Sequence, residues 1–395
     1  MTRTATAPTR PPSGAAASTP RTELRFRPVD LDTAPEVDAL LRRIGTGPFD
    51  RADVTALPGR NDTWAGRTTG GARVFVKRLT GPADDVAARM DRALAFERIT
   101  AGAPGGVLRG PALLGSDREA GLLAFEYLHD ARSGAELMAD QEFTPELARR
   151  AGTALGLLHA RPAGAERLDR AVPGMPSAAL LEALPAAAFE ELSGGELETW
   201  RLLQNDGPLI GAVDRLLAAE RAAPRVPAHC DLRLDQFLVT APAAAGGRAE
   251  LYAADWEEFR LADPARDVGG FAGEWLHRAV HDIVTSRGDT DTAAFAGLAM
   301  TRETVLARGA QKLARLRPLV QEFWGGYRDA RPDADPGLAE RATAFAGWHL
   351  LDRLLAGAAR SNRLLGIERA AAGIGRTALL APARFTHAVG LGDPS

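Results

Sequence analysis

The sequence predicts an α+β protein with two lobes, a small N-terminal lobe built on an antiparallel sheet and a larger, mostly helical C-terminal lobe. Between residues 53 and 128, short segments alternate in hydrophobicity and are punctuated by glycine, which is typical of strands. From about residue 144 onward, apolar residues recur at helical spacing. The chain has 395 residues, 45% of them hydrophobic, so it can bury the cores of two packed lobes.

The N-terminal lobe is assigned to residues 25–128. The segment TTGG at 68–71 is a hairpin signal between two alternating runs. The expected elements are, in order, a helix over 34–45, three antiparallel strands within 53–78, a helix over 81–101 and two strands around a turn at 116–120. Residues 1–24 precede this lobe and consist mainly of Pro, Ala, Thr, Ser and Arg, so we expect a disordered tail.

The C-terminal lobe is assigned to residues 129–395. A Thr-Pro start signal opens an apolar-periodic helix over 144–160. Short strand-like pieces at 226–240 and 248–255 surround a polar loop, and nearly everything from about 267 to 380 has helical spacing. The polar loop, set between strands in a helical lobe, is the segment in which we expect functional residues.

Composition excludes several classes of protein. The net charge of −3 gives no general attraction to nucleic acid or membranes. One cysteine, Cys230, allows no disulfide within the chain, which fits a reducing compartment. No run approaches the roughly 18 apolar residues of a membrane span, and the first residues lack the apolar core of a signal peptide. We therefore expect a cytoplasmic protein without nucleic-acid or membrane partners.

Two segments concentrate side chains that can take part in chemistry. PAHCDLRLDQFLVT contains His229, Asp231 and, five residues later, Gln236. ELYAADWEEF places Asp255 directly after a short apolar run. Either pattern alone is common, but the two together, about twenty residues apart with strands between them, are not expected by chance. Carboxylate and amide oxygens are ligands that suit Mg²⁺.

These segments resemble those of the aminoglycoside phosphotransferase and protein-kinase-like superfamily, and the resemblance covers roughly residues 50–360. It implies a bilobal protein-kinase-like fold and an enzyme that uses ATP and Mg²⁺ to phosphorylate a hydroxyl group. Asp231 would accept the hydroxyl proton, Gln236 and Asp255 would hold the metal, and His229 would anchor the loop. The family usually has Asn where this chain has Gln236, so a nucleotide-binding scaffold without activity stays open.

The same resemblance implies roles for Asp267 and for two residues of the N-terminal lobe. Asp267 would brace the catalytic loop, although it could also cap the helix that follows. Lys77 would contact the nucleotide phosphates. The chain has only two lysines and uses arginine almost everywhere else, which singles out Lys77. Glu97, rather than Asp91 on another side of the same helix, would pair with Lys77.

Two further nucleotide contacts follow from order along the chain. The segment GRNDTWAG between the first two strands would form a phosphate loop, in which Asn61 caps a tight turn and directs backbone N–H groups at the phosphates. An ordinary hairpin turn is the competing interpretation. The hinge that binds adenine would be FEYL, with Glu126 and Tyr127.

A finer resemblance concerns the acceptor. GRNDTWAGRTTGGARVFVKRLTG, RALAFER and DQFLV are similar to segments of the kinase subunits of class V lanthipeptide synthetases. Those proteins phosphorylate Ser and Thr of a ribosomally made precursor peptide, and a separate lyase then eliminates phosphate. The resemblance implies a peptide acceptor, with a lyase and a cyclase as separate chains.

The alternative acceptor is a small-molecule antibiotic such as an aminoglycoside or a macrolide. An aminoglycoside is a polycation, so its kinase would need an acidic cleft. Four carboxylates could supply one, although a solvated helix surface is their ordinary explanation; they are Glu257, Glu258, Glu274 and Asp282. Three arginines of the C-terminal helices could also line an acceptor site, and they are Arg353, Arg360 and Arg363.

Overall fold

The structure is a computed structural model of the chain. It describes residues 28–162, 168–173, 181–190, 192–204, 206–241, 249–289, 295 and 298–392. The tail predicted over residues 1–24 lies outside the described residues.

The N-terminal lobe is a five-stranded antiparallel sheet in the order β1-β2-β3-β5-β4. The turn at 68–71 joins β2 to β3, as the sequence predicts, with Thr68 N–H donating to Ala72 O at 2.8 Å. Its strands and helices are α2 (Pro35–Arg43), β1 (Phe49–Leu57), β2 (Asp62–Thr68), β3 (Arg73–Arg78), α3 (Ala83–Thr100), β4 (Leu113–Asp117) and β5 (Leu122–Glu126). The expected order of three strands, one helix and two strands is therefore confirmed.

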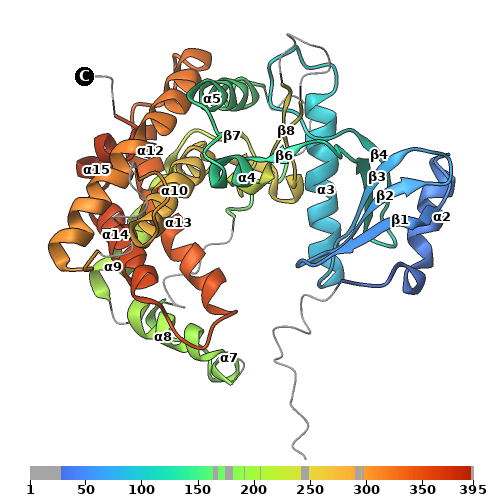
Figure 1. Ribbon diagram of the computed structural model, residues 1–395. Coiled ribbons are helices and arrows are strands. Elements are labelled where there is room, and N and C mark those ends of the chain that lie inside the picture. The colour runs from blue at the N-terminus through green and yellow to red at the C-terminus, as the bar shows by residue number, and fades with distance from the viewer. Residues whose placement is uncertain are drawn as a thin grey trace, which may run out of the picture.

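The two faces of this sheet carry different helices. Val74 and Val76 of β3 are buried against α2 in one apolar cluster. Leu123 of β5 packs with Met90 of α3 in another cluster on the opposite face. Because side chains alternate along a strand, Lys77 shares the α3 face and points away from α2. Figure 1 shows α3 standing between the sheet and the helical region.

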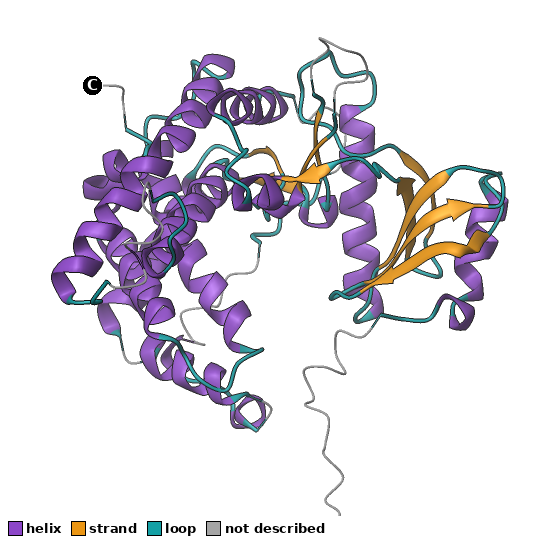
Figure 2. Ribbon diagram, viewed as in Figure 1, coloured by secondary structure: helices purple, strands orange, loops and turns teal. Residues whose placement is uncertain are grey.

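The C-terminal lobe is the part from β6 (Arg132–Ser133) onward, and helices form most of it (Figure 2). α5 (Pro145–His159) confirms the helix predicted over 144–160. The remaining helices are α4 (Gly134–Ala139), α7 (Ala186–Phe189), α8 (Gly194–Leu203), α9 (Gly207–Ala222), α10 (Ala265–His281), α12 (Arg302–Ala330), α13 (Leu338–Ala358), α14 (Gly366–Leu380) and α15 (Pro382–Val389). One apolar core joins α5, α10, α12, α13 and α14.

Short strands frame the polar loop that the sequence singles out. β7 (Val226–Ala228) leads into it and pairs with β10 (Arg260–Ala262). β8 (Phe237–Val239) leaves it and pairs with β6 and β9 (Leu251–Ala253). The loop is thus held at both ends by strand pairing, at the junction between the helical core and the N-terminal lobe.

The predicted fold class, a small antiparallel N-terminal lobe with a larger helical C-terminal lobe, is confirmed. Within the described part of the chain, none of the helices combines the length and the apolar character that crossing a bilayer requires.

Candidate active site

Asp267, in the first turn of α10, holds the loop that contains Asp231. Its carboxylate is fully buried and accepts the backbone N–H groups of His229 and Cys230, both at 2.7 Å. The same carboxylate bonds His159 of α5 at 3.1 Å. Burial opposes its ionisation, but the bond to His159 and these donors outweigh burial and lower the pKa of Asp267. Asp267 lies inside α10 and does not cap it: the N-cap residue is Pro264, which makes no side-chain cap bond, and Asp263 before it accepts Ala265 N–H at 2.9 Å.

His229 fixes the loop from within. Its Nε2 lies 2.9 Å from Ala254 O, and its Nδ1 lies 3.4 Å from the backbone nitrogen of Asp231. Since a carbonyl only accepts, Nε2 carries the proton and Nδ1 accepts from Asp231 N–H. His229 therefore ties the Asp231 loop to the residue that precedes Asp255.

Asp231 lies on the loop that Asp267 and His229 hold, and its side chain is 40% exposed. Arg233 donates from Nη1 to both carboxylate oxygens, at 3.1 and 2.8 Å. Burial raises the pKa of Asp231, Asp255 adds to the rise and Arg233 opposes it. The bonds of His229 to Asp231 N–H and to Ala254 O bring the Asp231 loop beside the turn that carries Asp255. Sequence reasoning passed over Arg233, although its place two residues after Asp231 brings it to the same loop.

Gln236 lies beneath Asp231 and is 4% exposed. Its Oε1 accepts Arg233 N–H at 2.9 Å, and its Nε2 lies 3.4 Å from Asp231 Oδ2. The structure thus uses the amide to brace the loop, and one lone pair of Oε1 is committed to Arg233. A metal at Gln236 would have to share that oxygen, so its role as a ligand stays a prediction.

Asp255 and Lys77 meet between the lobes. Asp255 has a left-handed backbone, with φ 69°, at the turn between β9 and the 3₁₀ helix η3 (Trp256–Glu258). Lys77 Nζ donates to Asp255 Oδ1. Burial disfavours both charges, yet their attraction outweighs it, raising the pKa of Lys77 and lowering that of Asp255.

The second partner of Lys77 is Glu257, not the expected Glu97. Nζ lies 2.7 Å from Glu257 Oε2. Arg89 of α3, fully buried, donates to Glu257 Oε1 at 2.8 Å. The expected Lys77–Glu97 pair is therefore corrected. Glu257, an acidic residue of the C-terminal lobe, binds Lys77, and α3 contributes the basic residue Arg89 as the partner of Glu257.

Helix phase explains this correction. Glu97 follows Arg89 by eight residues, which is about 12 Å along the helix and roughly 80° around it. The side chain of Glu97 makes no hydrogen bond or ion pair with the described residues, and burial raises its pKa to about 7. Arg89 was missed because a fully buried arginine is rare. A signal in the sequence could have identified Arg89: the spacing of Arg89, Arg92 and Phe96 places all three on one face of the helix.

Asn61 belongs to the same network and points inward. Its Oδ1 accepts from Arg89 Nη2 at 2.7 Å and from Thr80 N–H at 3.2 Å, while Nδ2 lies 3.3 Å from Glu257 Oε2. The side chain thus braces the turn before β2 against α3. The phosphate-loop role of the surrounding backbone stays a prediction.

The hinge residues lie where order along the chain put them, at the end of β5. Their backbone donors are used inside the fold: Glu126 N–H bonds Ala112 O at 2.8 Å, and Tyr127 N–H bonds Arg73 O at 3.2 Å. A purine held at this hinge would therefore bond other backbone groups, and the adenine contacts of Glu126 and Tyr127 stay predictions.

The four carboxylates of the proposed acidic cleft all have partners, arginines for three of them and a histidine for Glu274. Glu257 and Glu258 bind Arg89 and Arg92 of α3, at 2.8 and 3.4 Å. The other two pairs are Glu274 with His349 at 2.6 Å and Asp282 with Arg278 at 2.8 Å. No acidic cleft for a polycation results from these four groups.

Arg353 of α13 pairs with Asp352 at 2.8 Å, and its positive charge lowers the pKa of Asp231. Arg360 and Arg363 are exposed beyond the end of α13. A role for these three arginines in an acceptor site stays a prediction.

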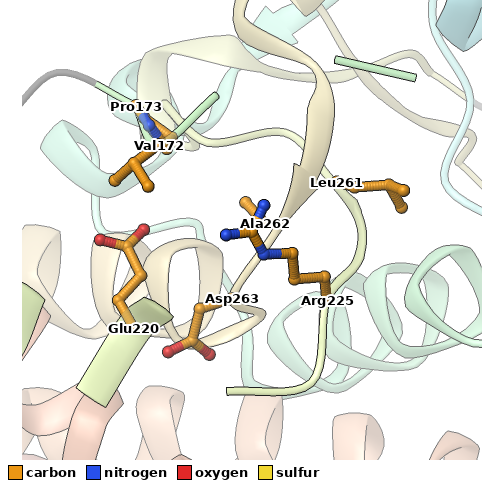
Figure 3. Close-up of a pocket in the computed structure, with 7 residues that line it drawn as sticks. All are labelled: Val172, Pro173, Glu220, Arg225, Leu261, Ala262 and Asp263. Carbon is orange, nitrogen blue, oxygen red and sulfur yellow. The ribbon is translucent and has the colours of Figure 1, made fainter. Parts of the chain in front are cut away.

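A small pocket lies apart from these residues, beside β10 (Figure 3). Its two acids are already paired, Glu220 with Arg266 and Asp263 with Arg341. It is lined by Val172, Pro173, Glu220, Arg225, Leu261, Ala262 and Asp263. None of the predicted site residues lines it, so it offers no alternative centre.

The donors present suit a magnesium-bound nucleotide better than a protein-only metal cage. Among the described residues, no group of three or more His, Cys, Asp or Glu side chains is arranged to hold a metal ion. Asp255 bonds Lys77 through Oδ1, which leaves Oδ2 for another partner. Magnesium in nucleotide sites commonly takes one or two protein carboxylates and completes its shell with phosphate and water.

Three solved structures to which this chain is similar are kinases or phosphotransferases. Amicoumacin kinase hAmiN, solved with AMP-PNP, Ca²⁺ and Ami, aligns with a TM-score of 0.51 at 14% identity, covering 91% of this chain and 95% of that one. Choline kinase LicA from Streptococcus pneumoniae gives 0.45 at 15% identity, covering 83% and 93%. Macrolide 2'-phosphotransferase MphH from Brachybacterium faecium gives 0.45 at 17%, covering 88% and 98%.

The family is identified by sequence. No curated protein matches the chain. The sequence pattern of the phosphotransferase enzyme family, however, matches residues 53–318. This match covers more than half of the chain and includes the site residues of both lobes. The protein therefore belongs to the phosphotransferase enzyme family and is a phosphotransferase.

Proposed function

We propose that this phosphotransferase moves the terminal phosphoryl group of ATP, with Mg²⁺, to a hydroxyl acceptor, and that Asp231 accepts the hydroxyl proton. The observation that carries the proposal is that His229, which bonds Asp231 N–H and Ala254 O, brings the Asp231–Arg233 pair beside the Lys77–Asp255 pair. Phosphoryl transfer depends on positioning and charge stabilisation, and these residues supply one proton acceptor and two cations.

Each residue has a distinct part. Asp231 orients the hydroxyl and takes its proton, and its raised pKa makes it a better base than an ordinary aspartate. Arg233 keeps Asp231 oriented and offsets negative charge near the transferred group. Lys77 contacts the phosphates, and Asp255 would hold the metal that neutralises them. The Ca²⁺ and AMP-PNP named for the amicoumacin kinase are consistent with a nucleotide and a divalent metal.

For the acceptor, we propose Ser or Thr side chains of a ribosomally made precursor peptide, with elimination by a separate lyase and ring closure by a separate cyclase. The support is the resemblance of the GRNDTWAG, RALAFER and DQFLV segments to class V lanthipeptide kinases. The positive charge of Arg353, which lowers the pKa of Asp231, would suit a neutral or acidic segment.

A small-molecule hydroxyl is the second candidate, and the choline and macrolide kinases of the same fold favour it. The pairing of Glu257, Glu258, Glu274 and Asp282 argues against a polycationic aminoglycoside within this class. A neutral antibiotic needs no acidic cleft and remains compatible with the site.

The experiment is mass spectrometry of a Ser/Thr-rich precursor peptide encoded beside the gene, incubated with the protein, ATP and Mg²⁺. We expect a gain of one phosphate per modified residue, and loss of that gain in Asp231→Asn. In parallel, a panel of choline, macrolides and aminoglycosides is tested by ADP release. Phosphorylated macrolide with an unmodified peptide would select the second candidate. ATP binding without transfer to any acceptor would indicate a non-catalytic scaffold.

A further inference from the structure

Protein donors engage both carboxylate oxygens of Glu257. Oε1 accepts from Arg89 Nη2 at 2.8 Å, and Oε2 accepts from Lys77 Nζ at 2.7 Å and from Asn61 Nδ2 at 3.3 Å. The residue is 8% exposed. Protein donors therefore occupy both oxygens. Glu257 is arranged to hold its neighbouring side chains and not to bind a ligand.

The two acidic partners of Lys77 differ in how easily they can be exchanged. The Asp255 side chain is 29% exposed, and Lys77 engages only its Oδ1. The Glu257 side chain is 10% exposed and has a second cation behind it. Separating a buried pair leaves an uncompensated charge, whereas an exposed carboxylate can take a new partner at lower cost. Lys77 can thus leave Asp255 for a phosphate while it keeps Glu257.

We propose that Glu257 is the positioning residue that aims Lys77 at the nucleotide phosphates, and that Arg89 orients Glu257. This assigns to the C-terminal lobe the part that sequence reasoning gave to Glu97 of α3. The inference rests on the proposed phosphotransfer, since it names how the phosphate-binding lysine of that reaction is held.

The packing of α3 explains why the arrangement is rigid. One turn beyond Arg89, Arg92 reaches Glu258 at 3.4 Å. One turn further, Phe96 stacks on Trp256 with ring centroids 3.5 Å apart and planes inclined by 6°. Three successive contacts therefore dock α3 along η3. Of the two glutamates in this seam, only Glu257 also binds Lys77, so Glu258 is a matched control for docking alone.

The test compares Glu257→Gln with Glu258→Gln and Glu97→Gln. ADP binding is measured by calorimetry in EDTA, where the contact of Lys77 with phosphate is read without the metal. We expect binding about 10-fold weaker in Glu257→Gln and near wild type in the two controls. In turnover, kcat should fall on the order of 10²-fold with the acceptor KM unchanged, because small displacements of a positioning group cost that much.

Further variants separate positioning from folding. Thermal unfolding shows whether each variant is folded at the assay temperature. Glu257→Asp, which keeps the charge, should recover part of the ADP affinity, and Arg89→Met should add little on top of Glu257→Gln because both act through one network. Equal losses in Glu257→Gln and Glu258→Gln, or a Glu97→Gln variant as impaired as Glu257→Gln, would overturn the proposal.

The outcomes also distinguish this inference from the proposed function. Transfer that is lost in Asp231→Asn but normal in Glu257→Gln would refute the role of Glu257 and leave phosphotransfer intact. Weakened ADP binding only in Glu257→Gln, with no phosphate moved to any acceptor by the wild type, would support the positioning of Lys77 and refute the proposed reaction.

Discussion

Lys77 and Glu257 form an ion pair across the two lobes, with Nζ and Oε2 2.7 Å apart. Lys77 lies on β3 of the sheet. Glu257 lies on η3, two residues after Asp255. The pair links the strand that carries the lysine to the turn that carries the second aspartate of the site. The lobes are thus held in register at the point where a nucleotide phosphate would bind.

Replacing Lys77 by arginine should not preserve activity. Lysine is a compact point charge and arginine a broad planar fork, so Arg would not fit between Asp255 and Glu257. We expect kcat/KM for ATP to fall on the order of 10²-fold, the cost of losing one preorganised charge contact. Steady-state kinetics at varied ATP checks this. Lys312→Arg, at the other lysine, is the control, and comparable kinetics for Lys77→Arg and wild type would contradict the role.

Activity should decline on acidification at a higher pH than an ordinary aspartate implies. Burial raises the pKa of Asp231, and only its ionised form can accept a proton. Arg233 opposes that rise, so Arg233→Met should move the acid limb of the pH–rate profile to still higher pH. The profile of kcat/KM for the acceptor measures this. An acid limb unmoved in Arg233→Met would argue that Asp231 does not set it.

Glu97→Gln should stabilise the protein above neutral pH. Burial raises the pKa of Glu97 to about 7, well above its unfolded value near 4.5, so wild-type stability falls as pH rises between these values. The gain should be absent below about pH 4.5 and reach about 1–2 kcal/mol at pH 8, after allowance for partial exposure. Urea unfolding at both pH values checks this. Equal unfolding free energies of wild type and Glu97→Gln at pH 8 would show that the pKa of Glu97 is not raised by burial.

Asp267→Asn should destabilise the protein and disorder the catalytic loop. The carboxylate accepts two backbone N–H groups and bonds His159, and an amide NH₂ would face a donor. We expect a loss of about 3–5 kcal/mol of unfolding free energy, typical of a broken buried charge network. Urea denaturation measures it, with Asp169→Asn at a partly exposed site as the control. A loss below about 1 kcal/mol would show that the loop is held otherwise.

Much of the fold was predictable because its signals are local. Alternation along β2 and β3, the turn at 68–71 and the helical spacing of α5 each lie within a short window, and local sterics fix them. The placement of Asp231 and Asp255 in one region was also predictable. β8, which follows the Asp231 loop, pairs with β9, which precedes Asp255.

The sequence by itself determined the order of elements, and it singled out the loop around Asp231 and Lys77 as candidates, because rare residues and short motifs carry these signals. Only the tertiary structure decided which acid binds Lys77. That choice depends on how α3 is rotated and docked, which the packing of Phe96 on Trp256 fixes across the whole chain. A helical pattern gives the phase of side chains relative to one another, but the direction in which they face comes from distant contacts.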